Sequence, residues 1–325
     1  MSGSANELVS AVSPIVRRVR AYFASVDRVA GVPVVFDAAQ IGGFDLDAAP
    51  APWIDLGWCS GFARSSATKI SALRTGAPAV VQTQVRTEVE ATVSLQFESW
   101  GKLQMALAAG SQQMNLLATT TGAAANGSGG VAAAAVPLAA GSTATALQVG
   151  DAAAAFSVGD LVVVDMDYAG QTGFVGSGVS GAYVASAAAL NGDVNYVRRV
   201  SLNVARVAEI SDGILQLGSA LLAGAPTAGM QVCKLVGFVD REGGGWFQEW
   251  SGLFVMEGEQ GDRVIYHYPR LQPMQGAVES FEPLAGPLER VKLAGAFRAL
   301  PVKDANDGET VVCFRSYLPG AWRAV

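Results

Sequence analysis

The chain offers few side chains that could catalyse a reaction. Its sole histidine, His267, lies between two aromatic residues in the run Tyr266-His267-Tyr268. A histidine beside an activated serine or cysteine could act as a general base. No G-x-S-x-G motif supports a serine nucleophile in this sequence. We therefore interpret His267 as a packed or surface residue of a strand and not as a base.

Two pairs of carboxylates occur at the spacing of a β-strand, Glu88 with Glu90 and Asp165 with Asp167. Residues two apart on a strand share a face, so each pair could bind a cation or act on a glycosidic bond. The aspartates are the better candidates for Ca²⁺, although no EF-hand spacing follows them. Strands facing water also carry acids for solvation alone, and we favour that interpretation for both pairs.

The remaining motifs give no cofactor or metal site. The glycine runs at 127–130 and 243–245 lack a following Lys-Ser/Thr and predict turns, not phosphate-binding loops. Cys59, Cys233 and Cys313 are widely spaced and form no C-x-x-C pair, so they predict small core residues and not a zinc site or a disulfide framework. We expect a protein that is not an enzyme, with no metal and no cofactor.

Trp246 and Trp250 suggest one further ligand. They are four residues apart, so on a strand they would share a face and could form a stacking platform for a sugar. Packing in the core explains these two side chains more simply. We keep a carbohydrate-binding module as the alternative from a different functional class.

Composition favours a subunit that hides part of its surface. Half of the 325 residues are apolar, and only 15% are charged, against roughly 25% in an ordinary soluble domain. A weakly charged surface suits a chain that packs against copies of itself, since monomers rarely expose large apolar patches. A bias toward alanine and glycine from a GC-rich genome is a second explanation. The net charge of −6 argues against a basic nucleic-acid-binding surface.

The clearest local pattern runs from Thr87 to Trp100, where apolar and polar residues alternate without a break. This period predicts a long strand with one buried face that includes Val89 and one wet, acidic face. From Trp100 to Ala109 the apolar residues Trp100, Leu103 and Leu107 fall at helical spacing, which predicts a short helix that ends at Gly110.

Other segments predict loops and further strands. Residues 119–143 are rich in alanine, glycine, serine and threonine and predict a flexible arm or a tolerated linker. Residues 145–228 predict a small β-domain, with strands at 161–164, 200–204 and 214–217. In the last third, the run after Val291 and the run after Val311 predict a hairpin that turns at 304–308. Many strands with glycine-rich turns indicate a sandwich or barrel class.

Nothing in the sequence indicates a membrane or an export signal. No apolar run reaches the 18 or so residues of a membrane span, and the basic residues near the N-terminus follow the apolar stretch instead of preceding it. We expect the protein to be made and kept in the cytoplasm.

Several stretches together resemble the first half of the major tail tube proteins of long-tailed bacteriophages. They are the lead-in from Leu56 to Arg64, the polar run from Ser65 to Gly76, and the acidic strand with the helix after it, from Thr87 to Gln104. The runs at 258–270 and 293–317 are compatible with the strands that complete such a subunit.

The resemblance implies a mainly β fold with short helices, built as a two-sheet sandwich or partial barrel. Residues 1–30 would form an N-terminal segment, residues 31–144 and 229–325 the tube-forming domain, and residues 145–228 an inserted, outward-facing β-rich domain. Six copies would join into rings, and the rings would stack into a virion tail tube assembled in the cytoplasm of the bacterial host. The partners would be further copies, other tail proteins, and phage DNA that passes without specific binding. Glu88, Glu90 and Glu98 would line the channel and repel DNA phosphates.

Another β-rich virion component, such as a capsid decoration, baseplate or tail-tip subunit, is the alternative.

Overall fold

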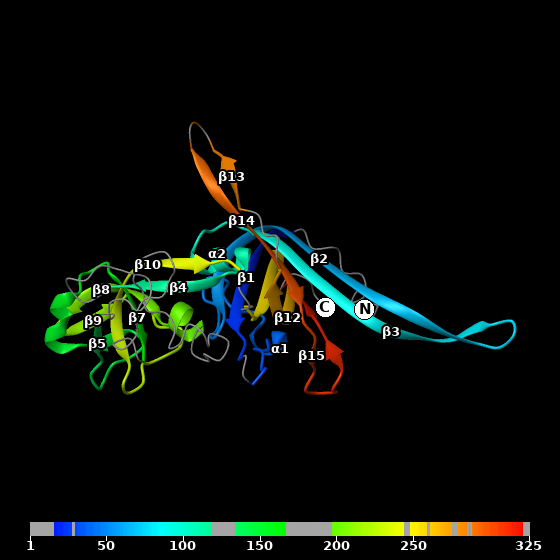
Figure 1. Cartoon of the computed structure of the whole chain (residues 1–325), viewed down its shortest axis with the longest axis horizontal. Coiled ribbons are helices and arrows are strands. Elements are labelled where there is room, and N and C mark those ends of the chain that lie inside the picture. The colour runs from blue at the N-terminus through cyan, green and yellow to red at the C-terminus, as the bar shows by residue number, and fades with distance from the viewer. Residues whose placement is uncertain are drawn as a thin grey trace, which may run out of the picture. The chain divides into compact units, whose positions relative to one another are not determined.

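The computed structural model describes residues 16–27, 30–118, 134–166, 197–243, 248–258, 261–274, 279–284, 286 and 288–320. Strands make up most of its regular structure (Figure 1). The α-helices of these residues are short, α1 (Ala38–Ile41) and α2 (Lys102–Ala109). The predicted mainly β class with short helices is confirmed.

The chain forms two compact units. Unit 1 takes residues 1–26, 31–110 and 247–325, and unit 2 takes residues 27–30 and 111–246. The predicted insertion, 145–228, is too narrow, because strands on both sides of it belong to unit 2. The predicted separate segment, 1–30, is also wrong in part, since residues 16–25 form a strand inside the sheet of unit 1.

Unit 1 is built on one antiparallel sheet with the strand order β13-β14-β3-β2-β1-β11-β12-β17. Its strands are β1 (Val16–Ser25), β2 (Ile54–Thr75), β3 (Val80–Phe97), β11 (Trp250–Gly258), β12 (Arg263–Pro273), β13 (Glu279–Pro283), β14 (Glu289–Ala299) and β17 (Phe314–Leu318). A further pairing joins β14 to β12, Leu271 opposite Ala299 and Pro273 opposite Phe297. The strands β14, β3, β2, β1, β11 and β12 therefore form a closed sheet.

Aromatic side chains fill the closed sheet. Phe23 of β1 lies 5.9 Å from Phe254 of β11 and 5.4 Å from Phe297 of β14, measured between ring centroids. These three residues are fully buried. The contact between Phe23 and Phe297 joins β1 and β14, which are not neighbours in the sheet, so the interior is one core.

Two glycines leave room for this packing. A Cβ on Gly295 of β14 would lie 2.9 Å from the Phe297 ring and 3.0 Å from the Phe97 ring, and one on Gly252 of β11 would lie 2.4 Å from Leu271. Distances this short force neighbouring side chains to move. The two glycines are therefore required by close packing.

We expect Gly295→Ala to lower the free energy of unfolding by about 1–3 kcal/mol, the usual cost of overpacking a core. The matched control is Gly43→Ala, because a Cβ at Gly43 meets nothing within 4 Å and the backbone there is not left-handed. Urea unfolding of both variants measures the difference. Equal stability of the two variants would contradict the packing described for the interior.

A second core covers the outer face of the same sheet. Residues 31–54, which include α1, bring Phe36, Leu46 and Trp53 against buried residues of the strands, among them Tyr22 and Leu253. Tyr22 and Phe23 are neighbours on β1 and point to opposite faces, as strand geometry requires. Both faces of this part of the sheet are therefore packed.

The helix predicted before Gly110 is present. Leu103 and Leu107 are buried in α2, and Gly110 caps the helix in the left-handed conformation with φ 65°. Trp100 differs from the prediction, because it precedes the helix and its side chain is 55% exposed.

Unit 2 contains a seven-stranded antiparallel sheet of order β4-β10-β7-β8-β9-β6, with β5 on β10. Its strands are β4 (Gln112–Leu117), β5 (Ala135–Pro137), β6 (Ala146–Gln148), β7 (Leu161–Asp165), β8 (Val204–Ser211), β9 (Ile214–Leu217) and β10 (Gln231–Arg241). Gln112 pairs with Arg241, so the first and last strands of the long segment of this unit, 111–246, are adjacent. The unit has its own core, centred on Leu147, Val162 and Val232.

The predicted strands of this region are confirmed at β7 and β9 and wrong at 200–204. There the chain forms a π-helix, Arg198–Leu202, and β8 begins only at Val204. Of the predicted arm, residues 119–133 lie outside the described residues, and Ala135–Pro137 pairs with β10.

The predicted C-terminal hairpin is also wrong. Only β15 (Val302–Lys303) and β16 (Thr310–Val311) pair across the turn. β14 pairs with β3 and β13, and β17 pairs with β12. The alternating pattern identified these strands but carried no information about their partners.

Candidate assembly surface

The most unusual feature of unit 1 is the hairpin of β2 and β3, which continues far beyond the closed sheet (Figure 1). The two strands pair from Cys59 opposite Phe97 to Thr75 opposite Val80. β14 accompanies β3 only from Ala91 to Phe97. Every residue from Ser65 to Glu90 is exposed. We call this segment the ribbon.

Large aliphatic side chains lie on both faces of the ribbon. Residues directly opposite each other on antiparallel strands point to the same face, so the register assigns each side chain. One face carries Ile70 opposite Arg86, Val81 opposite Arg74, and Val89 opposite Thr68. The other face carries Leu73 opposite Thr83, Val85 opposite Ser71, and Val80 opposite Thr75. These six aliphatic residues are 47–56% exposed.

Within a single chain, few contacts stabilise a ribbon of this kind. A two-stranded hairpin alone is at best marginally stable in water, because it buries little apolar area. The prediction that Val89 is buried is therefore wrong for the single chain, since Val89 is 47% exposed and no described element covers β3 at that position. A ribbon with aliphatic residues on both faces is suited to burial between other molecules.

The three glutamates predicted to line a channel all have basic partners. Glu88 forms an ion pair with Lys69, which lies opposite it on the ribbon. Glu90 pairs with Arg298 at 3.1 Å, and Glu98, just beyond β3, approaches Arg18 at 3.7 Å. Glu88 and Glu90 lie on the same strand face. Their surface is not a row of free carboxylates, because a cation balances each one.

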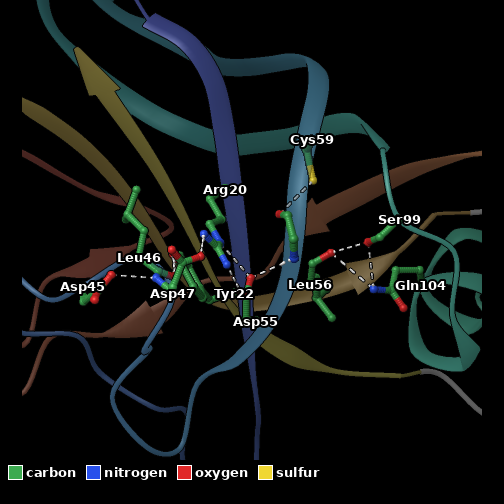
Figure 2. Close-up of polar contacts among 11 residues, drawn as sticks. Arg20, Tyr22, Asp45, Leu46, Asp47, Asp55, Leu56, Cys59, Ser99 and Gln104 are labelled. Atoms are coloured by element: carbon green, nitrogen blue, oxygen red, sulfur yellow. Dashed lines mark hydrogen bonds and ion pairs between the residues drawn. The ribbon is translucent and has the colours of Figure 1, made fainter. Parts of the chain in front are cut away.

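A polar cluster that the sequence patterns did not reveal fixes the loop before β2 onto β1. The guanidinium of Arg20 donates to both carboxylate oxygens of Asp55, and it donates to Asp47 at 2.6 Å (Figure 2). The same guanidinium lies 5.2 Å from the centre of the Trp58 ring. The Tyr22 hydroxyl donates to the Leu46 carbonyl at 2.8 Å. The carboxylates raise the pKa of Arg20, which is nearly buried.

We expect Arg20→Met to lower the free energy of unfolding by about 2–3 kcal/mol. Removing one partner of a buried ion pair leaves a poorly solvated charge, and the partial exposure of Asp55 reduces that cost. The matched control is Arg298→Met, whose ion pair with Glu90 is exposed and contributes at most about 1 kcal/mol. Chemical unfolding measures both variants. A loss no larger than that of the control would show that the Arg20 cluster does not stabilise the loop.

The structure places His267 in a packed aromatic environment, the first of the two strand positions that the sequence left open. The ring is 2% exposed, stacks on Phe314 at 5.7 Å, and approaches Trp53 at 5.9 Å. Its Nε2 lies 3.1 Å from the Val34 carbonyl oxygen, so Nε2 carries the proton and donates it. Burial lowers the pKa of His267 to about 4. A neutral ring enclosed by Phe36, Trp53 and Phe314 is not positioned as a general base.

The other candidate sites are closed or incomplete. Asp165 is 1% exposed and accepts from Arg198 at 2.8 Å, while Asp167 lies outside the described residues. Trp250 is 1% exposed and donates to Gln248 at 3.0 Å, so it cannot stack on a sugar; Trp246 lies outside the described residues.

Two of the three thiols lie in the core, as expected. Cys59 and Cys233 are buried, and burial raises the pKa of each to about 12. Cys313 is half-buried, and burial also raises its pKa.

Within the described ranges, no three acidic, histidine or cysteine side chains form a group that could hold a metal ion. No described helix has the length and apolar character needed to cross a membrane.

Comparison with known protein families and with curated proteins gave no match for this chain.

Proposed function

We propose that the chain is a structural subunit that assembles with copies of itself into the tail tube of a bacteriophage, and that it is not an enzyme. The exposed ribbon carries the proposal. None of the described elements of unit 1 covers Ser65–Glu90, which displays aliphatic side chains on both faces. A self-assembling chain resolves this exposure, because neighbouring copies cover the ribbon.

The resemblance of the segment from Leu56 to Gln104 to tail tube proteins supports the more specific part of the proposal. The described ribbon falls within that segment, and α2 begins at its end. In the proposed tube, rings of six copies stack and DNA passes through the centre. Unit 2 is an inserted module outside the tube wall.

The candidates for the channel lining remain Glu88, Glu90 and Glu98, with a modified role. Because each has a basic partner, the lining would be close to neutral and would repel DNA less than three free carboxylates. A nearly neutral wall also avoids binding phosphate, which suits a passage through which DNA slides.

Negative-stain electron microscopy of the purified full-length chain, over a range of protein concentrations, tests the proposal. We expect hollow rings at low concentration and stacked tubes of constant diameter at high concentration. Closed particles without a channel would instead favour a capsid decoration or tail-tip subunit. A chain that remains monomeric at high concentration would contradict self-assembly.

A further inference from the structure

The hairpin of β13 and β14 is a second projecting element with an uncovered apolar face. Phe281 lies opposite Val291, and these side chains are 68% and 38% exposed. The same face continues inward to Leu293, which is 1% exposed and belongs to the core of the closed sheet. An apolar stripe therefore runs from the core onto an exposed hairpin.

The two faces of this hairpin differ sharply. On one face, Glu282 forms ion pairs with Arg290 and Lys292, so the charges are satisfied there. On the other face, Glu279 and Glu289 flank Phe281 and Val291. Both glutamates are exposed, and neither has an ion-pair partner among the described residues. This apolar face is therefore bordered by two free negative charges. We call it the Phe281 face.

The tip of the ribbon has the complementary character. From Ile70 to Thr87 the sequence contains no acid and two arginines, Arg74 and Arg86. Both arginines are exposed, and neither has a carboxylate partner among the described residues. They lie beside Val81 and Ile70 on one ribbon face. The ribbon tip thus presents aliphatic residues bordered by free positive charges.

We infer that the ribbon tip of one copy docks on the Phe281 face of a second copy. This inference rests on the proposed function and names the surfaces that join its subunits. Within one chain the two hairpins leave the closed sheet in different directions, and their tips are far apart (Figure 1). Each surface therefore requires a partner, and a second copy of this chain supplies both the apolar contact and the opposite charge.

The contact is heterologous, since each copy uses a different surface to meet each neighbour. A contact of this type repeats from copy to copy and produces a closed ring or an open helix. Charge complementarity fixes the orientation, because reversing the contact would bring like charges together. The apolar residues supply most of the binding free energy.

Charge reversal with rescue tests the pairing. One variant carries Arg74→Glu and Arg86→Glu, a second carries Glu279→Lys and Glu289→Lys, and a third combines all four substitutions. Sedimentation velocity of the full-length chains measures the concentration at half-assembly. We expect at least a tenfold increase for each double variant and recovery to within about threefold of wild type for the quadruple variant.

The controls reverse a charge elsewhere on unit 1. Lys303→Glu and Glu309→Lys change exposed residues of the β15–β16 hairpin and should leave assembly unchanged. Circular dichroism checks that every variant is folded; all substituted residues are exposed, so folding should be retained.

The outcomes separate the two proposals. If the wild type assembles and both double variants assemble equally well, the docking inference is overturned and the proposal of self-assembly still stands. A quadruple variant no better than the doubles also overturns the docking inference. A wild type that stays monomeric overturns both.

Discussion

Removing the ribbon should abolish assembly and leave the subunit folded. In the proposed variant, residues 67–90 are replaced by Asn-Gly, which joins Ser66 and Ala91. Ser66 and Ala91 lie directly opposite each other on β2 and β3, so a two-residue turn between them closes the shortened hairpin without a change of register. The closed sheet is retained, because β14 pairs with β3 from Ala91 onward.

The expected loss is large because the ribbon displays six aliphatic side chains. Full burial of an aliphatic side chain of this size contributes about 1.5–3 kcal/mol to the free energy of association. The ribbon residues are half-exposed before assembly, so each contributes only part of that free energy. Even a few such contacts change an association constant by at least about 100-fold, since each 1.4 kcal/mol is a factor of ten. Sedimentation velocity should show only monomers at concentrations where the wild type assembles.

A second variant keeps the length of the ribbon and changes its surface. Ile70, Leu73, Val81 and Val85 all become threonine, which preserves β-branching or β-propensity and removes apolar area. The association constant of this variant should also fall, by a smaller factor than that of the deletion variant. Normal assembly of the shortened chain would show that the ribbon is not the contact, whatever other surface the copies use.

Acidification should destabilise unit 1 through His267. The pKa of this histidine is about 4 in the folded protein and about 6.5 in an unfolded chain. The unfolded state therefore binds the proton more readily, and stability falls as the pH decreases from 6.5 toward 4. The loss attributable to His267 is about 2 kcal/mol between pH 7 and pH 4.5 and about 3 kcal/mol when complete.

His267→Gln isolates this contribution from that of the carboxylates. Glutamine does not titrate in this range, and its amide can still donate to the Val34 carbonyl. Tryptophan fluorescence is a suitable probe of unfolding, because the tryptophans that the structure describes, Trp53, Trp58, Trp100 and Trp250, all belong to unit 1. The variant should be less stable than wild type at pH 7, and its stability should vary less with pH. Parallel pH profiles for the two proteins would contradict the burial of a neutral His267.

Local patterns in the sequence were sufficient to identify many elements. The alternation through Val93, Leu95 and Phe97 predicted the buried face of β3, and these three residues are inside the closed sheet. The helical spacing before Gly110 predicted α2. Both predictions depend only on the period of apolar residues, which one strand or helix determines by itself.

The extent of the buried face could not be predicted in the same way. Val89 continues the alternation of β3, but it is 47% exposed because, among the described strands, β2 alone pairs with β3 at that position. An alternating strand looks the same whether its apolar face is covered by its own chain or by another molecule. The pattern was therefore correct about the strand and wrong about what covers it.

Long-range pairings were also beyond the reach of sequence patterns. The closure of the sheet depends on β14 reaching the end of β12, and the predicted pairing of β14 with the last strand was wrong. The cluster of Arg20, Asp47 and Asp55 was missed for the same reason. Asp47 and Asp55 are 27 and 35 residues from Arg20 and meet it only because β1 lies beside β2.

Amide hydrogen exchange along the ribbon tests the central claim most directly. The protein is labelled in D₂O at a concentration below assembly and at one well above it, and peptides covering residues 65–90 are followed by mass spectrometry. In the monomer these amides belong to a two-stranded ribbon with no cover and should exchange quickly. In the assembled state we expect exchange at least 100-fold slower across the ribbon, while peptides of β11, already buried in unit 1, change little. Exchange of the ribbon that is equally fast at both concentrations would contradict the account.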